Sequence, residues 1–194
     1  MANPVSGGGG ALIILDMLNR LDFDGGERLR PHAEAAAAAI LALRDQADAA
    51  GAPVIYCNDN HGDWTDDRAA LIAKAKADDP PGRKLAEMLE PSADDYVVVK
   101  PQFSGFYATT LPAILPRLGV DRFALTGVAA DICVLFTAAD AHMREYKLWV
   151  PADAVASEAP ERARWALDIM EKSMGAETSP TTALKLTDWL AAPA

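Results

Sequence analysis

The sequence predicts an α/β protein, a three-layer α/β/α sandwich on a mainly parallel, doubly wound sheet. Short runs rich in β-branched residues alternate with longer helical segments, which is typical of parallel strands joined by helices. Runs such as 12–15 and 97–99 are apolar without alternation, so helices should cover both faces of the sheet. The length of 194 residues suits one domain with a substantial core.

Strands and helices can be placed approximately along the chain. The first helix is predicted from about Pro31 to Ala50, because proline is favoured at a helix start and Gly51 follows the end. The segment 59–81 is expected to be largely irregular, with a short helix between 66 and 77, and such long loops are often binding lids. The expected strands are 11–16, 53–58, 96–100, 122–127 and 147–151.

The first ten residues and the rest of the chain are expected to differ in order. Residues 1–10 are predicted to be a flexible leader, and 11–194 a single domain. The glycines at 7–10 do not follow a strand and lead into no GK[ST] sequence, so they are not read as a phosphate-binding loop. The N-terminus lacks the basic and apolar regions of a secretion signal, and we expect a cytoplasmic location.

Charge and cysteine content exclude several classes of function. The net charge is -10 without a Lys/Arg block, so binding to nucleic acid or to an anionic membrane surface is not expected. No run approaches the roughly 20 apolar residues that cross a bilayer. The two cysteines, Cys57 and Cys133, have no ligand-like spacing, so we expect reduced thiols and neither a disulfide framework nor a structural zinc site.

An acid, a base and a thiol are predicted at one edge of the sheet. Ligands of open α/β sheets bind outside the carboxyl ends of the strands. Asp16 ends the first strand, Lys100 ends the third, and the fourth leads through 127–131 to Cys133 at a helix start. Singly, each has an ordinary structural explanation, as an inert thiol, a turn-forming carboxylate and a solvated ammonium. Together they favour a catalytic site.

The three side chains are chemically coherent. A thiolate is the reactive form of cysteine, and a nearby ammonium and a helix N-terminus both lower a thiol pKa. Cys133 is therefore expected to be an activated nucleophile beside Lys100, with Asp16 moving the proton between the thiol and the leaving group. Pro101 should hold residue 100 in an extended conformation.

Three segments resemble the isochorismatase-like cysteine hydrolases, which include nicotinamidases and N-carbamoyl-amide and ureidoacrylate-type amidohydrolases. They are LIILDMLNRL (12–21), VVVKPQFSGFYATTL (97–111) and the stretch from 125 to 157 that contains ADICV. The resemblance implies a Rossmann-like α/β fold for 11–194 and a catalytic triad of Asp16, Lys100 and Cys133. It also implies a cis peptide bond between Val128 and Ala129, with an oxyanion hole from the N–H groups of Ala129 and Cys133.

A metal site is not expected. Nicotinamidases are similar in having Asp-x-His after the second strand, which Asp59 and His61 would supply, but they need a further histidine downstream. The three histidines here, His32, His61 and His142, do not provide it. Asp59 and His61 are thus weak metal candidates, and the favoured explanation is a loop aspartate that caps a turn and a histidine at the surface or the pocket rim. No cofactor is predicted.

The favoured function is hydrolysis of an amide or ureide C–N bond in a small molecule, through a covalent cysteine intermediate. The alternatives are hydrolysis of a vinyl ether, as in isochorismatase itself, a metal-dependent nicotinamidase, a flavodoxin-like binding module and a catalytically idle homologue. The absence of GxGxxG or a P-loop after any predicted strand argues against the binding module. A homo-oligomer is expected from the resemblance, and the substrate itself is left open.

Four aromatic side chains in loops after the first three strands are candidates for the substrate pocket, although aromatic residues often fill cores instead. Cys57 is a weaker candidate for the nucleophile because no helix begins after it, and His142 is expected to be structural. The pocket candidates are Phe23, Trp64, Phe103 and Phe106.

Overall fold

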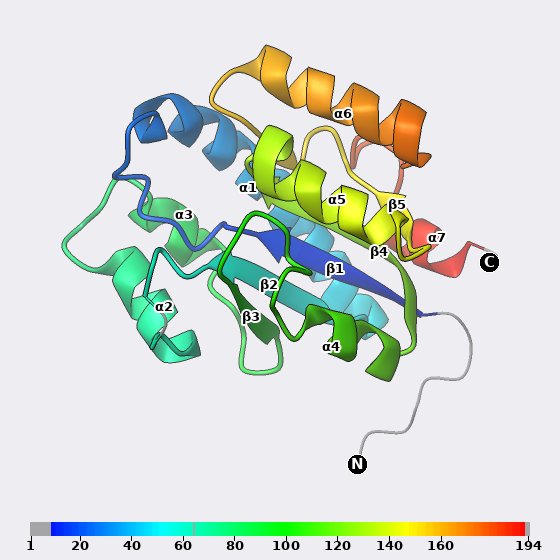
Figure 1. Cartoon of the computed structure of the whole chain (residues 1–194), viewed down its shortest axis with the longest axis horizontal. Helices are drawn as coiled ribbons and strands as arrows, with labels where there is room; N and C mark the ends of the chain where they lie inside the picture. Colours follow the sequence, from blue (N-terminus) through cyan, green and yellow to red (C-terminus); the bar gives the residue numbers. More distant parts are fainter. Residues whose placement is uncertain (1–8, 64, 193–194) are drawn as a thin grey trace.

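The computed structural model describes residues 9–63 and 65–192 and confirms the predicted α/β sandwich (Figure 1). The strands lie in the order β3-β2-β1-β4-β5, and their pairings are parallel. The short β6 (Val155–Ala156) pairs with the end of β4. The chain begins in the middle of the sheet and winds outward first to one side and then to the other. The strands are β1 Gly9–Leu15, β2 Val54–Asp59, β3 Tyr96–Lys100, β4 Val120–Val128 and β5 Lys147–Trp149.

Helices cover both faces of the sheet. Alternate residues of β1 point to opposite faces, so Leu12 and Ile14 pack in a cluster with α1, α2, α3 and α7, and Ile13 and Leu15 in one with α4, α5 and α6. Figure 1 shows α5 and α6 together on the face opposite α1. The helices are α1 Gly26–Ala50, α2 Arg68–Lys76, α3 Arg83–Met88, α4 Leu111–Arg117, α5 Leu135–His142, α6 Pro160–Met174 and α7 Leu186–Ala191.

Two predicted boundaries were wrong. Gly9 and Gly10, expected in the leader, belong to β1, and a Cβ on Gly10 would lie 2.0 Å from a methyl group of Leu190, so α7 packs closely there. The rest of the leader, 1–8, lies outside the described residues. Helix α1 begins at Gly26, five residues before the predicted start, because Gly25 turns the chain with a φ of 92°. Pro31 therefore lies inside the helix.

The expectation that helices cover both faces of the strands with unbroken apolar runs fails for β3. This strand lies at the edge of the sheet, and Tyr96 is 39% exposed while Val97 and Val99 are only partly buried. The apolar run at 97–99 therefore does not indicate a strand with both faces buried. In the described sheet, β3 is an edge strand that pairs with β2. No helix within the described part of the chain is long and apolar enough to cross a membrane.

Candidate active site

Asp16, Lys100 and Cys133 meet at the carboxyl edge of the sheet, as the sequence predicted. The Sγ atom of Cys133 lies 3.4 Å from Nζ of Lys100. The same Nζ lies 2.9 Å from Oδ2 of Asp16. A carboxylate, an ammonium and a thiol are therefore within reach of one another for proton transfer.

Strand register produces this meeting. Leu15 of β1 is in register with Cys57 of β2, and Asp59 of β2 with Lys100 of β3, so the carboxyl ends of the three strands are aligned. Asp16 follows β1 directly with a φ of 53°, and its backbone N–H donates to the carbonyl of Cys57 at 3.2 Å. Its carboxylate accepts the N–H of Asp59 at 2.6 Å. Asp16 is thus fixed by both its backbone and its side chain.

Lys100 is fully buried, and its charge is shared by two carboxylates. Nζ contacts Asp16 and lies 3.4 Å from Oδ2 of Asp59, and it also donates to the carbonyl of Gln102 at 3.3 Å. Burial alone would lower the pKa of Lys100, but the nearby Asp16 and the other acidic groups outweigh it and raise the pKa above its ordinary value. Lys100 therefore remains an ammonium at neutral pH.

The resting thiol of Cys133 differs from the sequence expectation. Its pKa is raised to about 12 because burial disfavours the thiolate and Asp16 repels it, and Lys100 offsets only part of this. Burial also raises the pKa of the Asp16 carboxyl, while Lys100 and a hydrogen bond with Cys133 oppose that rise. The expected activation of the thiol by Lys100 and a helix start was therefore wrong in direction, because burial and the adjacent carboxylate dominate.

Cys133 lies in a π-helical turn, η1 (Ala130–Val134), that continues into α5. The peptide bond between Val128 and Ala129 is cis. The carbonyl of Ala129 accepts the N–H groups of Ile132 and Val134, at 3.0 and 3.2 Å, which flank the N–H of Cys133. These two bonds fix the backbone on both sides of Cys133.

Asp131 anchors this turn to the neighbouring elements. Its Oδ1 accepts the hydroxyl of Ser157 at 2.5 Å, and its Oδ2 lies 2.5 Å from Nη2 of Arg162 on α6. The other side of the site is fastened in a similar way, since Ser104 donates to Asp140 of α5 at 2.5 Å. Both segments around Cys133 are therefore held to the helical layer.

The two weak metal candidates, Asp59 and His61, form other contacts in the structure. Asp59 contacts Lys100, and its Oδ1 accepts the backbone N–H of His61 at 2.7 Å, which closes a turn in which His61 has a φ of 48°. Nδ1 of His61 lies 3.9 Å from Oδ1 of Asp59. Among residues 9–63 and 65–192, no three His, Cys, Asp or Glu side chains form a metal-binding group. The absence of a metal cofactor remains a prediction.

A cleft of about 360 Å³ opens beside the triad. No triad side chain lines the cleft, but the cleft adjoins the triad through Asn60, which lines it and whose backbone N–H donates to the carbonyl of Lys100 at 3.0 Å. Its walls come from the loops after β1 and β2 and from α2. The described residues that line it are Leu18, Asn19, Arg20, Asp22, Phe23, Asn60, His61, Asp63, Asp66, Leu71, Lys74 and Ala75.

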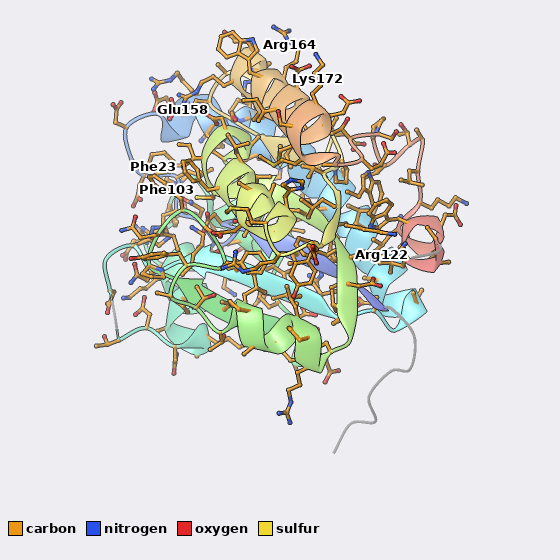
Figure 2. The ribbon with its side chains drawn as sticks, turned by 45° about the vertical axis from the view of Figure 1, so that its right-hand side comes forward. Phe23, Phe103, Arg122, Glu158, Arg164 and Lys172 are labelled. Atoms are coloured by element: carbon orange, nitrogen blue, oxygen red, sulfur yellow. The ribbon has the colours of Figure 1, made fainter. Side chains whose placement is uncertain are left out.

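The pocket candidates divide into different environments. Phe23 lines the cleft and is 46% exposed, and Phe103 is 49% exposed, with its ring 5.6 Å from that of Phe136. Figure 2 shows Phe23 and Phe103 on one side of the molecule and Arg122, from the start of β4, on the other. Phe106 instead lies in the core beside Tyr146 and does not line the cleft. Trp64 lies outside the described residues.

Sequence reasoning missed two functions of the end of β2. Asp59 was considered as a metal candidate or a turn-capping residue; it does cap the turn at His61, and it is also a partner of Lys100, which was not predicted. Asn58 is buried and holds the loop after β1, since its side chain accepts the N–H of Leu18 at 3.0 Å and donates to its carbonyl at 3.1 Å. Both residues follow the rule that already located Asp16 and Lys100, because they end a strand at the same edge of the sheet.

The chain is similar to known proteins over most of its length. Residues 10–183 match the family model described as an isochorismatase domain. The isochorismatase family protein YaaI of Bacillus subtilis is 38% identical over 167 residues, which cover 86% of this chain and 91% of YaaI. Enterobactin synthase component B of Escherichia coli K12 is 36% identical over 149 residues, 75% of this chain but 52% of that protein.

A solved structure gives the same indication. The crystal structure of N-carbamoylsarcosine amidase from Thermoplasma acidophilum superposes with a TM-score of 0.69 and 32% sequence identity. The match covers 89% of this chain and 96% of the amidase chain. The similarity thus extends over most of both chains.

Proposed function

The chain belongs to the isochorismatase family of hydrolases, and we propose that it cleaves an amide or ureide C–N bond of a small molecule through a covalent intermediate on Cys133. The observation that carries the proposal is the buried ammonium of Lys100 between the carboxylate of Asp16 and the thiol of Cys133. These are a proton carrier, a fixed positive charge and a nucleophile in mutual contact. A binding module would not need that set.

The first half of the reaction forms a C–S bond. Because the resting thiol is protonated, Asp16 takes its proton as Sγ attacks the substrate carbonyl. Lys100 stabilises the developing thiolate, and the N–H groups of Ala129 and Cys133 are proposed to donate to the carbonyl oxygen as it becomes negative. The tetrahedral species then expels the amine, the C–N bond breaks, and the amine leaves with the proton from Asp16.

The second half regenerates the enzyme. Asp16, again ionised, removes a proton from water as its oxygen attacks the acyl carbon bound to Sγ. The C–S bond breaks, the acid product leaves, and the thiolate recovers its proton from Asp16. One water is consumed, and no oxidant, reductant or metal takes part in these steps.

The test is a panel of small amides, ureides, esters and vinyl ethers with the purified protein and its Cys133→Ala variant. We expect wild-type turnover of an amide or ureide, loss of it in the variant, and an acyl adduct on Cys133 in rapidly quenched wild-type samples by mass spectrometry. Hydrolysis of a vinyl ether alone, or amide hydrolysis that survives in Cys133→Ala, would refute the proposal. Light scattering on the same preparation tests the expected homo-oligomer.

A further inference from the structure

The cleft beside the triad has more negative than positive groups. Asp22, Asp63 and Asp66 line it together with two cations, Arg20 and Lys74. Each cation already has a carboxylate partner, since Arg20 lies 2.7 Å from Asp22. Nζ of Lys74 lies 2.5 Å from Asp63 and 2.6 Å from Asp66. The formal charges of these five Asp, Arg and Lys side chains sum to -1.

Arg20 and Lys74 are also held in place by further contacts. Nη1 of Arg20 donates to the carbonyls of Lys74 and Ala77, at 2.9 and 2.8 Å, so the guanidinium is fixed against the end of α2. Lys74 is held by Asp66, whose side chain is only 7% exposed. A carboxylate entering the cleft would have to displace one of these bonds before it could gain a cationic partner.

Asp59 extends the negative charge to the nucleophile. Its side chain is 31% exposed and lies between Lys100 and the turn of His61, and His61 lines the cleft. Lys100 cannot offer a full charge to an anionic substrate, because Asp16 and Asp59 share it. The cleft and the triad therefore both present an excess of negative charge to an incoming molecule.

From this charge distribution we infer that the site takes an uncharged or cationic amide and discriminates against substrates that carry a carboxylate. An apolar group of the substrate would lie against Leu18, Phe23 and Leu71, which line the same cleft. The inference rests on the proposed function, since it names the substrate class of that reaction. One uncompensated charge a few ångströms from a bound carboxylate should reduce its binding about 10- to 100-fold.

The first test needs no knowledge of the substrate. The full chain is alkylated with iodoacetamide, which is neutral, and iodoacetate, which is anionic, at low ionic strength, and the rate at Cys133 is followed by mass spectrometry. We expect the iodoacetate-to-iodoacetamide rate ratio to be about 10- to 100-fold below the ratio for 2-mercaptoethanol. A ratio equal to or above that of the free thiol would overturn the inference.

Matched variants separate the cleft from the charge of the whole protein. Asp22→Asn releases Arg20 from its carboxylate and should raise the iodoacetate-to-iodoacetamide ratio about 3- to 10-fold. Asp168→Asn is the control, because Asp168 has a similar partner, Lys172 at 2.5 Å, but lies on α6. It should leave the ratio unchanged. Equal changes in both variants would assign the discrimination to the net charge and contradict the inference.

A substrate series distinguishes failure of the inference from failure of the proposed function. Pentanamide, 4-aminobutanamide and glutaramate share an amide and three methylene groups but end in a methyl, an ammonium and a carboxylate. We expect kcat/KM for glutaramate to be the lowest by about 10- to 100-fold. If glutaramate were the best of the three, hydrolysis would stand and the inference would fall. If wild type hydrolysed no amide or ureide, the proposed function would fall, and the alkylation ratio would still decide the charge preference.

Discussion

The two cysteines lie at the same edge of the sheet but in opposite environments. Cys57 is near the end of β2, fully buried, and its Sγ faces the carbonyl of Gly105 at 3.8 Å. Cys133 lies in the turn after β4, is partly exposed, and contacts Lys100. Burial raises the pKa of both thiols, and of Cys57 more strongly than of Cys133. A position at this edge of the sheet is therefore not sufficient, and solvent access together with a contacting cation distinguishes the proposed nucleophile, Cys133, from the packing residue Cys57.

The largest expected difference is between the alanine variants of the two cysteines. Cys133→Ala should reduce turnover to the background of the assay, because the nucleophile is lost, while its thermal unfolding stays close to wild type. Cys57→Ala should keep kcat within a few-fold and lose about 1 kcal/mol of stability from the small cavity that it creates. Activity assays and denaturant unfolding of both variants check this. Comparable loss of turnover in both would end the distinction.

Next in size are the side chains that interact with the thiol of Cys133, which are Asp16 and Lys100. Asp16→Asn and Lys100→Met should each lower turnover by about two to four orders of magnitude, the range for removing a positioned proton carrier or a fixed charge. Circular dichroism must show that each variant is folded, because both positions are buried. If the folded variants turned over substrate near the wild-type rate, Asp16 and Lys100 would have only a structural role.

Alkylation should separate the roles of Asp16 and Lys100. Asp16 raises the pKa of Cys133, so Asp16→Asn lowers that pKa and should speed iodoacetamide labelling at pH 7 several-fold. Lys100 lowers the same pKa, so Lys100→Met should slow labelling. With a wild-type pKa of about 12, labelling of Cys133 should rise about tenfold per pH unit from 7 to 10 without a plateau, and should precede labelling of Cys57. A plateau near neutral pH would indicate a preformed thiolate.

A smaller effect tests the packing around Cys57. A Cβ on Gly105 would lie 3.0 Å from Sγ of Cys57 and 3.3 Å from a methyl of Leu111, so Gly105→Ala should cost about 1 kcal/mol. In the Cys57→Ala background the new methyl group has room, and the cost should fall by at least half. A double-mutant cycle of unfolding free energies measures this coupling. Additive costs would show that Sγ does not limit the space at residue 105.

The smallest expected effect is that of metal removal. Because Asp59 is engaged with Lys100 and with the turn at His61, dialysis against EDTA should leave turnover unchanged. Loss of activity with EDTA, restored by a divalent cation, would make Asp59 and His61 metal ligands and require a further ligand from this chain or another.

The sequence was most informative where backbone and position decide the outcome. Strand ends at one edge of a parallel sheet located Asp16 and Lys100, and the resemblance located the cis bond after Val128. Side-chain direction could not be obtained in this way. Phe106 and Phe103 are three residues apart in one loop, yet one fills the core and the other is half exposed. Periodicity does not apply within loops, so nothing in their spacing separates them.

The pKa of Cys133 was beyond sequence reasoning for a related reason. The neighbours of the thiol were named correctly, but the sign of the shift depends on how burial and the repulsion from Asp16 compare with the attraction of Lys100. That balance depends on distances and on solvent exclusion. The two-residue β6 was missed because so short a strand leaves no hydrophobic pattern.

The central position of β1 has a consequence for synthesis of the protein. The hydroxyl of Thr126 on β4 donates to the carbonyl of Ile13 on β1 across 113 residues of sequence, at 2.9 Å. At about 5 to 20 residues per second, a ribosome needs roughly 5 to 20 s after making β1 to make its β4 neighbour. Until then β1 can pair only with β2. The backbone N–H and C=O groups on the side of β1 that later faces β4 have no strand partner. A nascent chain that stalls before β4 therefore exposes an apolar strand edge, which is prone to aggregate. Cys133, which follows β4, has not yet been made at that stage.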